Sequence, residues 1–214
     1  AVSAVAIDGR DTASAPNATT TTVDLDRLQD EVAAAFLGDW HRWRGLDVVV
    51  TSTFARERPD GDRLESDMVV VQLGADRVVS RLGGAEGYID GDRLRCVPES
   101  DGSTRCDRTP TGLTAEELID GELETWAEYL SGVPPYYRIL RTDDGCYELV
   151  LTRALPAADF GSVARFCFDE ASGALARTRI EYANGLIETN QATLIDLEAD
   201  PALLDELQRR PAGG

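Results

Sequence analysis

The chain of 214 residues contains no lysine, so all 21 of its basic residues are arginine. With 39 acidic residues, its formal net charge at pH 7 is −18. This balance disfavours nucleic-acid binding, because a phosphate backbone is bound by a basic surface. It disfavours electrostatic adhesion to an anionic membrane for the same reason. Solubility is the simplest explanation of the charge.

Motifs of the common catalytic classes are missing as well. The only histidine is His41, which leaves little room for a Ser-His-Asp set, and no Gly-x-Ser-x-Gly elbow occurs. A Gly-Lys loop that would cradle phosphate is absent too. A carboxylate pair stays an open alternative, because acidic residues are abundant throughout. We expect a protein that is not an enzyme and that uses no cofactor.

No apolar run approaches the roughly 18 residues that cross a bilayer. Residues 1–22 are rich in Ala, Ser and Thr and nearly free of large apolar side chains, a composition typical of a disordered tether or stalk. The sequence starts at Ala1 without methionine, as a mature secreted protein or one cut after a signal or lipid-anchor site would. We therefore expect an extracytoplasmic protein, secreted or anchored to the outer face of the cell membrane.

Four cysteines predict two disulfides in an exported chain. Cys96 and Cys106 flank a hairpin with its turn near Asp101-Gly102, and Cys146 and Cys167 would join two neighbouring strands. We expect the pairs Cys96–Cys106 and Cys146–Cys167. A zinc site is disfavoured, because no Cys-x-x-Cys occurs and the single histidine adds little. Free core thiols are the remaining alternative.

The pattern of the chain predicts an α+β fold, with a large curved antiparallel sheet covered by an N-terminal helix and a mid-chain helical insertion. The first helix is expected over residues 24–37, with Leu25, Leu28, Val32 and Phe36 on one face and Gly38 at its end. The second is opened by a capping box at Thr114–Glu117 and is interrupted at Gly121. Short strands at 46–58, 65–73, 77–82, 87–89, 93–98, 103–107, 136–141 and 146–153 complete a single domain over 23–208. A final short helix with Leu203, Leu204 and Leu207 precedes a frayed tail at 209–214.

The stretch from Arg165 to Leu197 predicts three further strands. Asn184-Gly185 between the last two favours a two-residue type I′ turn, which fixes the register of the hairpin. On one face this register pairs Tyr182 with Ile187, Ile180 with Thr189, Thr178 with Gln191, and Ala176 with Thr193. The opposite face would meet water and carries Arg177, Arg179, Glu181 and Glu188.

In this layout the chain resembles the bacterial lipoprotein-carrier superfamily, which groups Lol-type periplasmic carriers and LppX-like actinobacterial envelope lipoproteins. The resemblance covers roughly residues 23–208. It rests on the N-terminal helix before the first long strand, the insertion at 114–131 and the run FDEASGALARTRIEYANGLIETNQATL. It implies a half-open β-barrel closed by helices, with a hydrophobic cavity for acyl chains. No functional residue of the family maps onto this sequence.

From these patterns we expect a cell-envelope protein, a monomer, that holds acyl chains of a lipid or lipoprotein in an apolar cavity. The candidate lining residues are Val48, Val50, Phe54, Met68, Val70, Trp126, Ile180 and Tyr182, all of which would equally serve as a plain core. The alternative is an extracytoplasmic sensor or protein-interaction module on the same fold without a lipid. Trp40, Trp43 and Trp126 would form an aromatic rim over a cavity or pack the helices on the sheet.

Glycine lies beside aspartate at three points, Asp60-Gly-Asp62, Asp90-Gly-Asp92 and Asp143-Asp144-Gly145. None supplies the alternating ligands and distal Glu of a calcium-binding EF-hand loop. Hairpin turns explain them more simply, so no metal site is expected.

Overall fold

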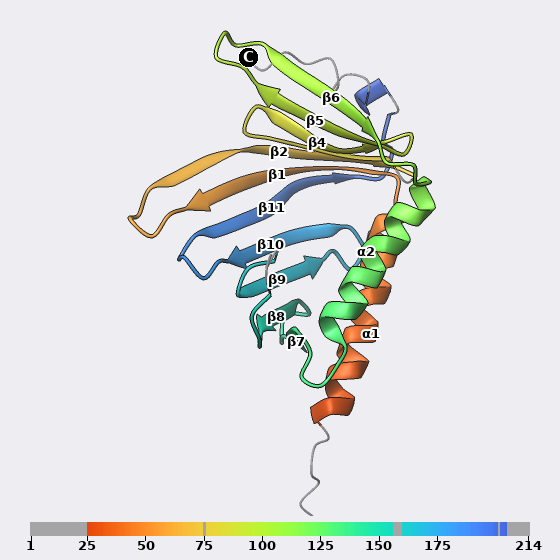
Figure 1. Ribbon diagram of the computed structural model, residues 1–214, viewed down its shortest axis with the longest axis vertical. Helices are drawn as coiled ribbons and strands as arrows, with labels where there is room; N and C mark the ends of the chain where they lie inside the picture. The colour runs from red at the N-terminus through yellow and green to blue at the C-terminus, as the bar shows by residue number, and fades with distance from the viewer. Residues whose placement is uncertain (1–24, 75, 156–159, 201, 205–214) are drawn as a thin grey trace, which may run out of the picture.

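The computed structural model describes residues 25–74, 76–155, 160–200 and 202–204. Eleven strands form one antiparallel sheet that is not closed into a barrel, and two helices lie side by side at one end of the strands (Figure 1). The predicted tether at 1–22, the tail at 209–214 and Leu207 lie outside the described residues. In the described part of the chain, no helix is long and apolar enough to cross a membrane.

The elements follow the predicted order. The helices are α1 (Leu25–Arg44) and α2 (Ala115–Leu130). The strands are β1 (Val48–Glu57), β2 (Arg63–Leu73), β3 (Asp76–Arg81), β4 (Gly84–Ile89), β5 (Asp92–Pro98), β6 (Thr104–Pro110), β7 (Tyr137–Arg141), β8 (Tyr147–Leu151), β9 (Val163–Phe168), β10 (Leu175–Glu181) and β11 (Ile187–Asp196). Their order across the sheet is β6-β5-β4-β3-β2-β1-β11-β10-β9-β8-β7, so the first and last strands meet at its centre.

Helix α1 is longer than predicted, because Gly38 does not end it. The helix continues to Arg44, and this places Trp40 and Trp43 on the buried face with Ala33 and Phe36. The predicted face was wrong at Leu28, which is half exposed. Burial of two large aromatic rings outweighs the weak helix propensity of a single glycine. Gly121 likewise leaves α2 unbroken.

The predicted capping box opens helix α2. The Thr114 hydroxyl accepts a hydrogen bond from the Glu117 backbone, and the Glu117 carboxylate accepts one from the Thr114 backbone.

Both disulfides form as predicted, joining Cys96 to Cys106 and Cys146 to Cys167. The hairpin-turn interpretation also holds at Asp60, whose side chain accepts from the Asp62 backbone beside Gly61 at φ +88°.

The β10–β11 register differs from the prediction by one residue. The loop contains three residues, Ala183 to Gly185, and is closed by a hydrogen bond from Tyr182 N to Leu186 O. Its last residue, Gly185, lies in the left-handed region. Such a loop ends in a bulge and is one residue longer than a two-residue type I′ turn. The strand pairing therefore shifts by one residue. The observed pairs replace all four that were predicted: Glu181 with Ile187, Ile180 with Glu188, Arg179 with Thr189, Thr178 with Asn190, and Arg177 with Gln191.

This shift changes the chemistry of the two faces. Glu188 lies on the same face as Ile180, which is the face that the helices cover, and not on the predicted solvent face. Thr189 and Gln191 move to the opposite face. Glu181 faces Ile187 on the outer face, and its carboxylate pairs with Arg179 at 2.9 Å.

We call the face of the sheet that contacts α1 and α2 the inner face. Two apolar clusters lie on it. One joins α1 and α2 to β7, β8 and β9 around Phe36, Trp40, Trp126 and Phe166. The other joins Trp43 to β1 and β2. The helices therefore cover only the end of the sheet where Figure 1 places them, and the opposite strand ends project beyond them.

A third cluster lies on the outer face and was not predicted. It contains Val71, Val78 and Leu94, and Leu203 and Leu204 from the C-terminal segment pack against it. This explains why the β2 sequence Val69-Val70-Val71 does not alternate in polarity. Its two sides are both buried, and such strands read as continuous apolar runs.

Candidate ligand-binding face

Five of the eight predicted lining residues come together on the inner face. Val48, Val50, Phe54, Met68 and Val70 form one strip on β1 and β2, packed against Trp43 and Ala174. Antiparallel register places Val50 opposite Val70, and Ser52 opposite Met68. The five side chains are at most 7% exposed, so in this conformation the strip is an apolar core that runs out from helix α1.

The other three predicted residues lie elsewhere on the inner face. Trp126 belongs to the aromatic cluster under the helices, where it stacks on Phe160 at a centroid distance of 4.0 Å. Ile180 borders that cluster. Trp40, Trp43 and Trp126 are all buried, as ordinary packing between helices and sheet predicts.

Tyr182 lies beside the β10–β11 loop, and its hydroxyl donates to Glu188 Oε2 at 3.4 Å. Partial burial, followed by the neighbouring Glu188 carboxylate, raises the pKa of the Tyr182 phenol above its usual value. The phenol therefore stays protonated at neutral pH and serves as a hydrogen-bond donor.

The end of the apolar strip farthest from the helices is covered by charged side chains. Phe54 is 2% exposed, and the guanidinium groups of Arg81 and Arg56 lie 5.0 and 5.8 Å from its ring centroid. Glu188 holds both arginines, with 2.8 Å between its Oε1 and Arg56 Nε and 3.9 Å between its Oε2 and Arg81 Nη1. We call Arg56, Arg81 and Glu188 the polar roof. It is made of side chains alone, so rotamer changes can open it without moving the backbone.

Polar atoms without partners surround Phe54 beneath this roof. Ser66 and Asn190 are its two cross-strand neighbours, and Ser52 precedes it by two positions on the same face. The Oγ atoms of both serines and Oδ1 of Asn190 are buried and have no hydrogen-bond partner among the described residues. Buried polar atoms are normally paired, so an unpaired group of three indicates a place for water or for a polar group of a ligand.

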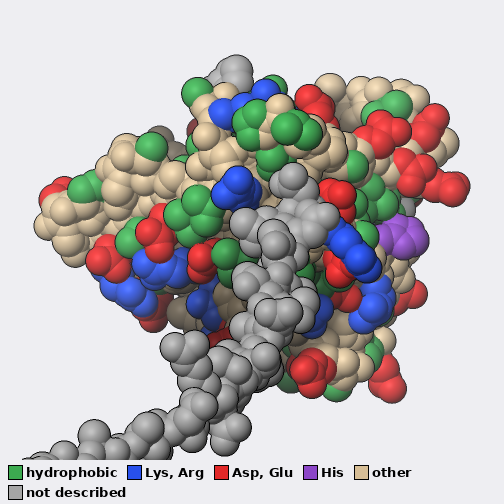
Figure 2. Space-filling model, turned by 90° about the horizontal axis from the view of Figure 1, so that it is seen from below, with side chains coloured by type: hydrophobic (Ala, Val, Ile, Leu, Met, Phe, Trp, Pro, Cys, Tyr) green, Lys and Arg blue, Asp and Glu red, His purple; other side chains and the backbone are tan. Residues whose placement is uncertain are grey.

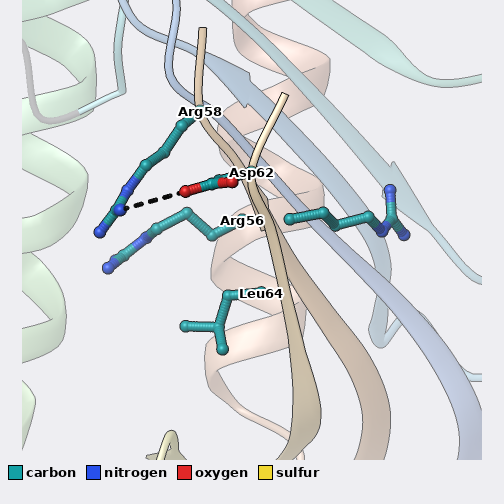
Figure 3. Close-up of a pocket in the computed structure, with 5 residues that line it drawn as sticks. Arg56, Arg58, Asp62 and Leu64 are labelled. Atoms are coloured by element: carbon teal, nitrogen blue, oxygen red, sulfur yellow. Dashed lines mark ion pairs between the residues drawn. The ribbon is translucent and has the colours of Figure 1, made fainter. Parts of the chain in front are cut away.

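A shallow pocket of about 280 Å³ continues the inner face beyond the roof, at the β1–β2 turn. Figure 3 shows Arg56, Arg58 and Leu64 projecting on one side of this turn, with Arg58 paired to Asp62 at 3.9 Å. Leu64 is 50% exposed and lies opposite Arg56 in the register. An apolar side chain thus stands at the outer edge of the roof.

At the end nearest the helices, the inner face carries a buried arginine, Arg44, whose guanidinium forms hydrogen bonds with two side chains. Arg44 ends helix α1, and its guanidinium donates to Gln72 Oε1 and to Glu122 on α2, with 2.8 Å between Arg44 Nε and Glu122 Oε2. The Gln72 amide in turn donates to the carbonyls of Trp43 and Leu46. This network fixes the end of α1 against β2 and against α2.

Arg77 lies next to this network and differs from Arg44. It faces Gln72 across the β2–β3 pair, and its Nε atom is buried without a hydrogen-bond partner among the described residues. Burial, followed by the positive charge of Arg44, lowers the pKa of Arg77 to about 10, and the carboxylates of Glu122 and Glu86 partly offset this shift. Arg77 therefore still carries a positive charge at neutral pH.

The remaining surface is mixed in charge. Figure 2 shows basic, acidic and apolar side chains interspersed over one face, and His41 is exposed. Within the described ranges, no group of three or more His, Cys, Asp or Glu side chains is placed to hold a metal ion.

The polar part of the face was missed by the sequence interpretation. Arg56, Arg77, Arg81, Glu188 and Asn190 were not proposed as site residues. For Glu188 and Asn190, the one-residue register error hid their position. For the arginines of β3 a signal was present, because Arg77 and Arg81 are four positions apart, an even spacing that puts side chains on one face of a strand.

The sheet and its helices define an α+β protein with a half-open, helix-covered antiparallel sheet. No protein-family model and no curated protein sequence matches this chain. Among solved structures, it is similar to a LolA superfamily protein from Nitrosomonas europaea, with a TM-score of 0.36, 10% identity and coverage of 84% of this chain and 98% of the other.

Two further solved structures are similar to this chain. A putative outer membrane lipoprotein-sorting protein domain from Vibrio parahaemolyticus gives a TM-score of 0.38 at 11% identity, over 85% of this chain and 100% of the other. The complex of MucA and MucB from Pseudomonas aeruginosa gives 0.41 at 18% identity, over 83% of this chain and 61% of the other. The superfamily that the sequence layout resembles is thus represented among the similar structures. These scores describe a loose likeness of chain path and say nothing about what this protein binds.

Proposed function

We propose that this protein is an extracytoplasmic binding protein that holds the acyl chain of a lipid or lipoprotein, without covalent chemistry, along the inner face of its half-open sheet. The chain would lie on the strip formed by Val48, Val50, Phe54, Met68 and Val70. Its far end would lie beside Leu64, at the end of the strip that the helices do not cover.

The observation that carries this proposal is the covering of Phe54. A core phenylalanine is normally covered by apolar side chains of another element, whereas here two arginines lie over the ring. Their long side chains can swing outward, and the atoms they uncover are apolar apart from Ser52, Ser66 and Asn190. Each methylene that replaces water on such a surface contributes about 0.8 kcal/mol.

The extracytoplasmic part of the proposal is supported by the two disulfides, which form and persist mainly in oxidising compartments. Each ties two neighbouring strands of the sheet, Cys96–Cys106 between β5 and β6 and Cys146–Cys167 between β8 and β9. Anchoring to the membrane outer face would depend on residues outside the described ranges.

The test is calorimetric titration of the purified, lipid-extracted protein with monooleoylglycerol and with oleoyl lysophosphatidate, which share one tail. We expect saturable binding of at least one of them. Leu64→Ser should weaken it about fivefold, since roughly half of a leucine side chain loses its apolar contact. Leu194→Ser is the matched control, because Leu194 is exposed to a similar extent, 58% against 50%, and lies off the inner strip. Failure of both amphiphiles to bind would refute the proposal.

A second candidate function is a protein-interaction module that takes no lipid. It is favoured by Leu194 and Leu197, which are exposed beside a depression of about 470 Å³ that also includes Ala171 and Ala176. Exposed apolar side chains that border a hollow mark interaction surfaces more often than isolated ones do. If the protein is an interaction module, Leu194→Ser should weaken binding of the partner protein and Leu64→Ser should not. This is the reverse of the result expected for acyl-chain binding.

A further inference from the structure

The inner face of β3 to β6 concentrates arginine in an otherwise acidic protein. Directly paired residues of antiparallel strands share a face, so the register extends the inner face from Gln72 to Arg77, Tyr88, Arg93 and Thr109 in one row. The neighbouring rows add Arg81, Glu86, Arg95, Arg105 and Asp107. Five arginines and two carboxylates therefore share this part of the face, whereas the whole chain carries a formal charge of −18.

Three of these arginines have no carboxylate at ion-pair distance among the described residues: Arg77, Arg93 and Arg95. Glu86 pairs with Arg81 at 3.5 Å, and Asp107 pairs with Arg105 at 3.8 Å. Glu122, the nearest acid on α2, is occupied by Arg44 and by the indole of Trp40. The acidic groups on hand are thus already engaged.

Arg77 is the most informative of the three. Its Nε is buried and unpaired, and the adjacent Arg44 adds a second positive charge. The carboxylates of Glu122 and Glu86 offset this charge only in part, so a counter-ion from outside would stabilise the half-buried guanidinium. A guanidinium also offers a planar fork that matches the oxygens of a phosphate or carboxylate.

Arg77 is also continuous with the apolar strip. Val79, two residues along the same strand, lies opposite Val70 and packs against the cluster that contains Phe54 and Met68. A molecule with its tail on that strip would therefore place its head near Arg77, Arg93 and Arg95. A free anion would use only the arginines and would leave the strip unused.

We propose that the inner face of β3 to β5 binds the anionic headgroup, a phosphate or carboxylate, of the amphiphile whose tail lies on the apolar strip, with Arg77 as its main contact and Arg93 and Arg95 as secondary ones. This inference rests on the proposed function and adds the class of ligand. The protein would distinguish an acidic amphiphile from a neutral one with the same tail.

The experiment compares oleoyl lysophosphatidate with monooleoylglycerol by calorimetric titration of the full chain. One fork-like arginine contact corresponds to about a tenfold preference for the anionic ligand. Arg77→Gln should remove most of that preference, Arg77→Lys should retain part of it, and Arg93→Gln with Arg95→Gln should reduce it to a lesser degree. Arg179→Gln is the control, because Arg179 lies on the outer face and should leave the preference unchanged.

Three outcomes would overturn the inference. Equal affinity of the wild-type protein for the two amphiphiles would refute it while leaving acyl-chain binding intact. Binding of inorganic phosphate as tight as that of lysophosphatidate would identify a free anion as the ligand. Displacement of lysophosphatidate by micromolar hexaglutamate, lost in Arg77→Gln, would identify an acidic peptide. If neither amphiphile binds, the proposed function itself fails, so the two failures are distinguishable.

A thermal unfolding measurement guards against a purely structural role. Since no described residue forms a hydrogen bond or an ion pair with Arg77, Arg77→Gln should unfold close to the wild-type temperature. Arg44→Gln should unfold at a lower temperature, because it would leave Glu122 and Gln72 without their partner. A lower unfolding temperature for Arg77→Gln would show that the side chain supports the fold, which would count against a headgroup contact.

Discussion

Arg56 on β1 and Glu188 on β11 are 132 positions apart in the sequence, yet Arg56 Nε lies 2.8 Å from Glu188 Oε1 above the Phe54 ring. The pair forms because β1 and β11 are neighbours at the centre of the sheet and these two residues face each other in the register. Arg81 and Tyr182 also contact Glu188, so one carboxylate holds the polar roof together.

Glu188→Gln should loosen this roof. The carboxylate is largely buried, and its loss leaves Arg56 without a counter-charge and Arg81 with Glu86 alone, so we expect a loss of about 1–2 kcal/mol in the free energy of unfolding. Urea denaturation measures the free energy of unfolding. Stopped-flow mixing of the variant with an amphiphile that the wild type binds should show faster association. Glu181→Gln is the control, since the exposed Arg179–Glu181 pair should contribute no more than about 0.5 kcal/mol. Equal unfolding midpoints for the two variants would contradict the role given to Glu188.

Asp144 predicts an acid-sensitive contribution to stability. A hydrogen bond from the Thr142 hydroxyl, followed by Arg165 and then Arg177, lowers the pKa of Asp144 from 3.8 to about 2. Because the folded-state pKa lies below the unfolded one, the contribution is complete above about pH 4 and is lost as the pH falls towards 2. The difference in unfolding temperature between wild type and Asp144→Asn should therefore shrink over that interval. Asp143→Asn, at the exposed neighbouring position, should show no such trend, and a constant difference for Asp144→Asn would refute the prediction.

Gly38 lies inside helix α1, and a β-carbon built there meets nothing within 4 Å. Gly38→Ala should stabilise the protein by about 0.5–1 kcal/mol, because alanine loses less backbone entropy in a helix. Gly87→Ala is the opposite case, since its β-carbon would lie 1.9 Å from the Arg77 carbonyl oxygen. It should destabilise the protein by more than about 2 kcal/mol. Thermal unfolding of both variants checks the pair, and a lower unfolding temperature for Gly38→Ala would contradict the free space at that position.

The elements and the disulfides could be predicted because their signals are local. The capping box at Thr114 and the turn residues between strands each act within a few positions of the chain, and the paired cysteines are only 10 and 21 positions apart. Helix α1 shows where local signals fail. Gly38 is a poor helix residue on its own, and only the burial of Trp40 and Trp43 against distant strands carries the helix past it.

The candidate site was only half predictable for the same reason. The apolar strip follows from alternation along β1 and β2, and Val48, Val50, Phe54, Met68 and Val70 do lie together. The polar roof depends on the β10–β11 register, which is set by whether Asn184-Gly185 closes a loop of two or three residues. Alternation predicts burial, whereas the relation between Arg56 and Glu188 requires knowing which strands are neighbours.

The pairing of β1 with β11 has a consequence for how the protein reaches its folded state. Val50 pairs with Ile195, so the middle of the sheet joins the first of its strands to be synthesised to the last one. Until β11 is available, β1 keeps one open edge, which is a template for pairing with another chain. Contacts this distant in sequence form slowly. We therefore expect the sheet to be completed only after β11 has been synthesised, with a need for protection from aggregation before then.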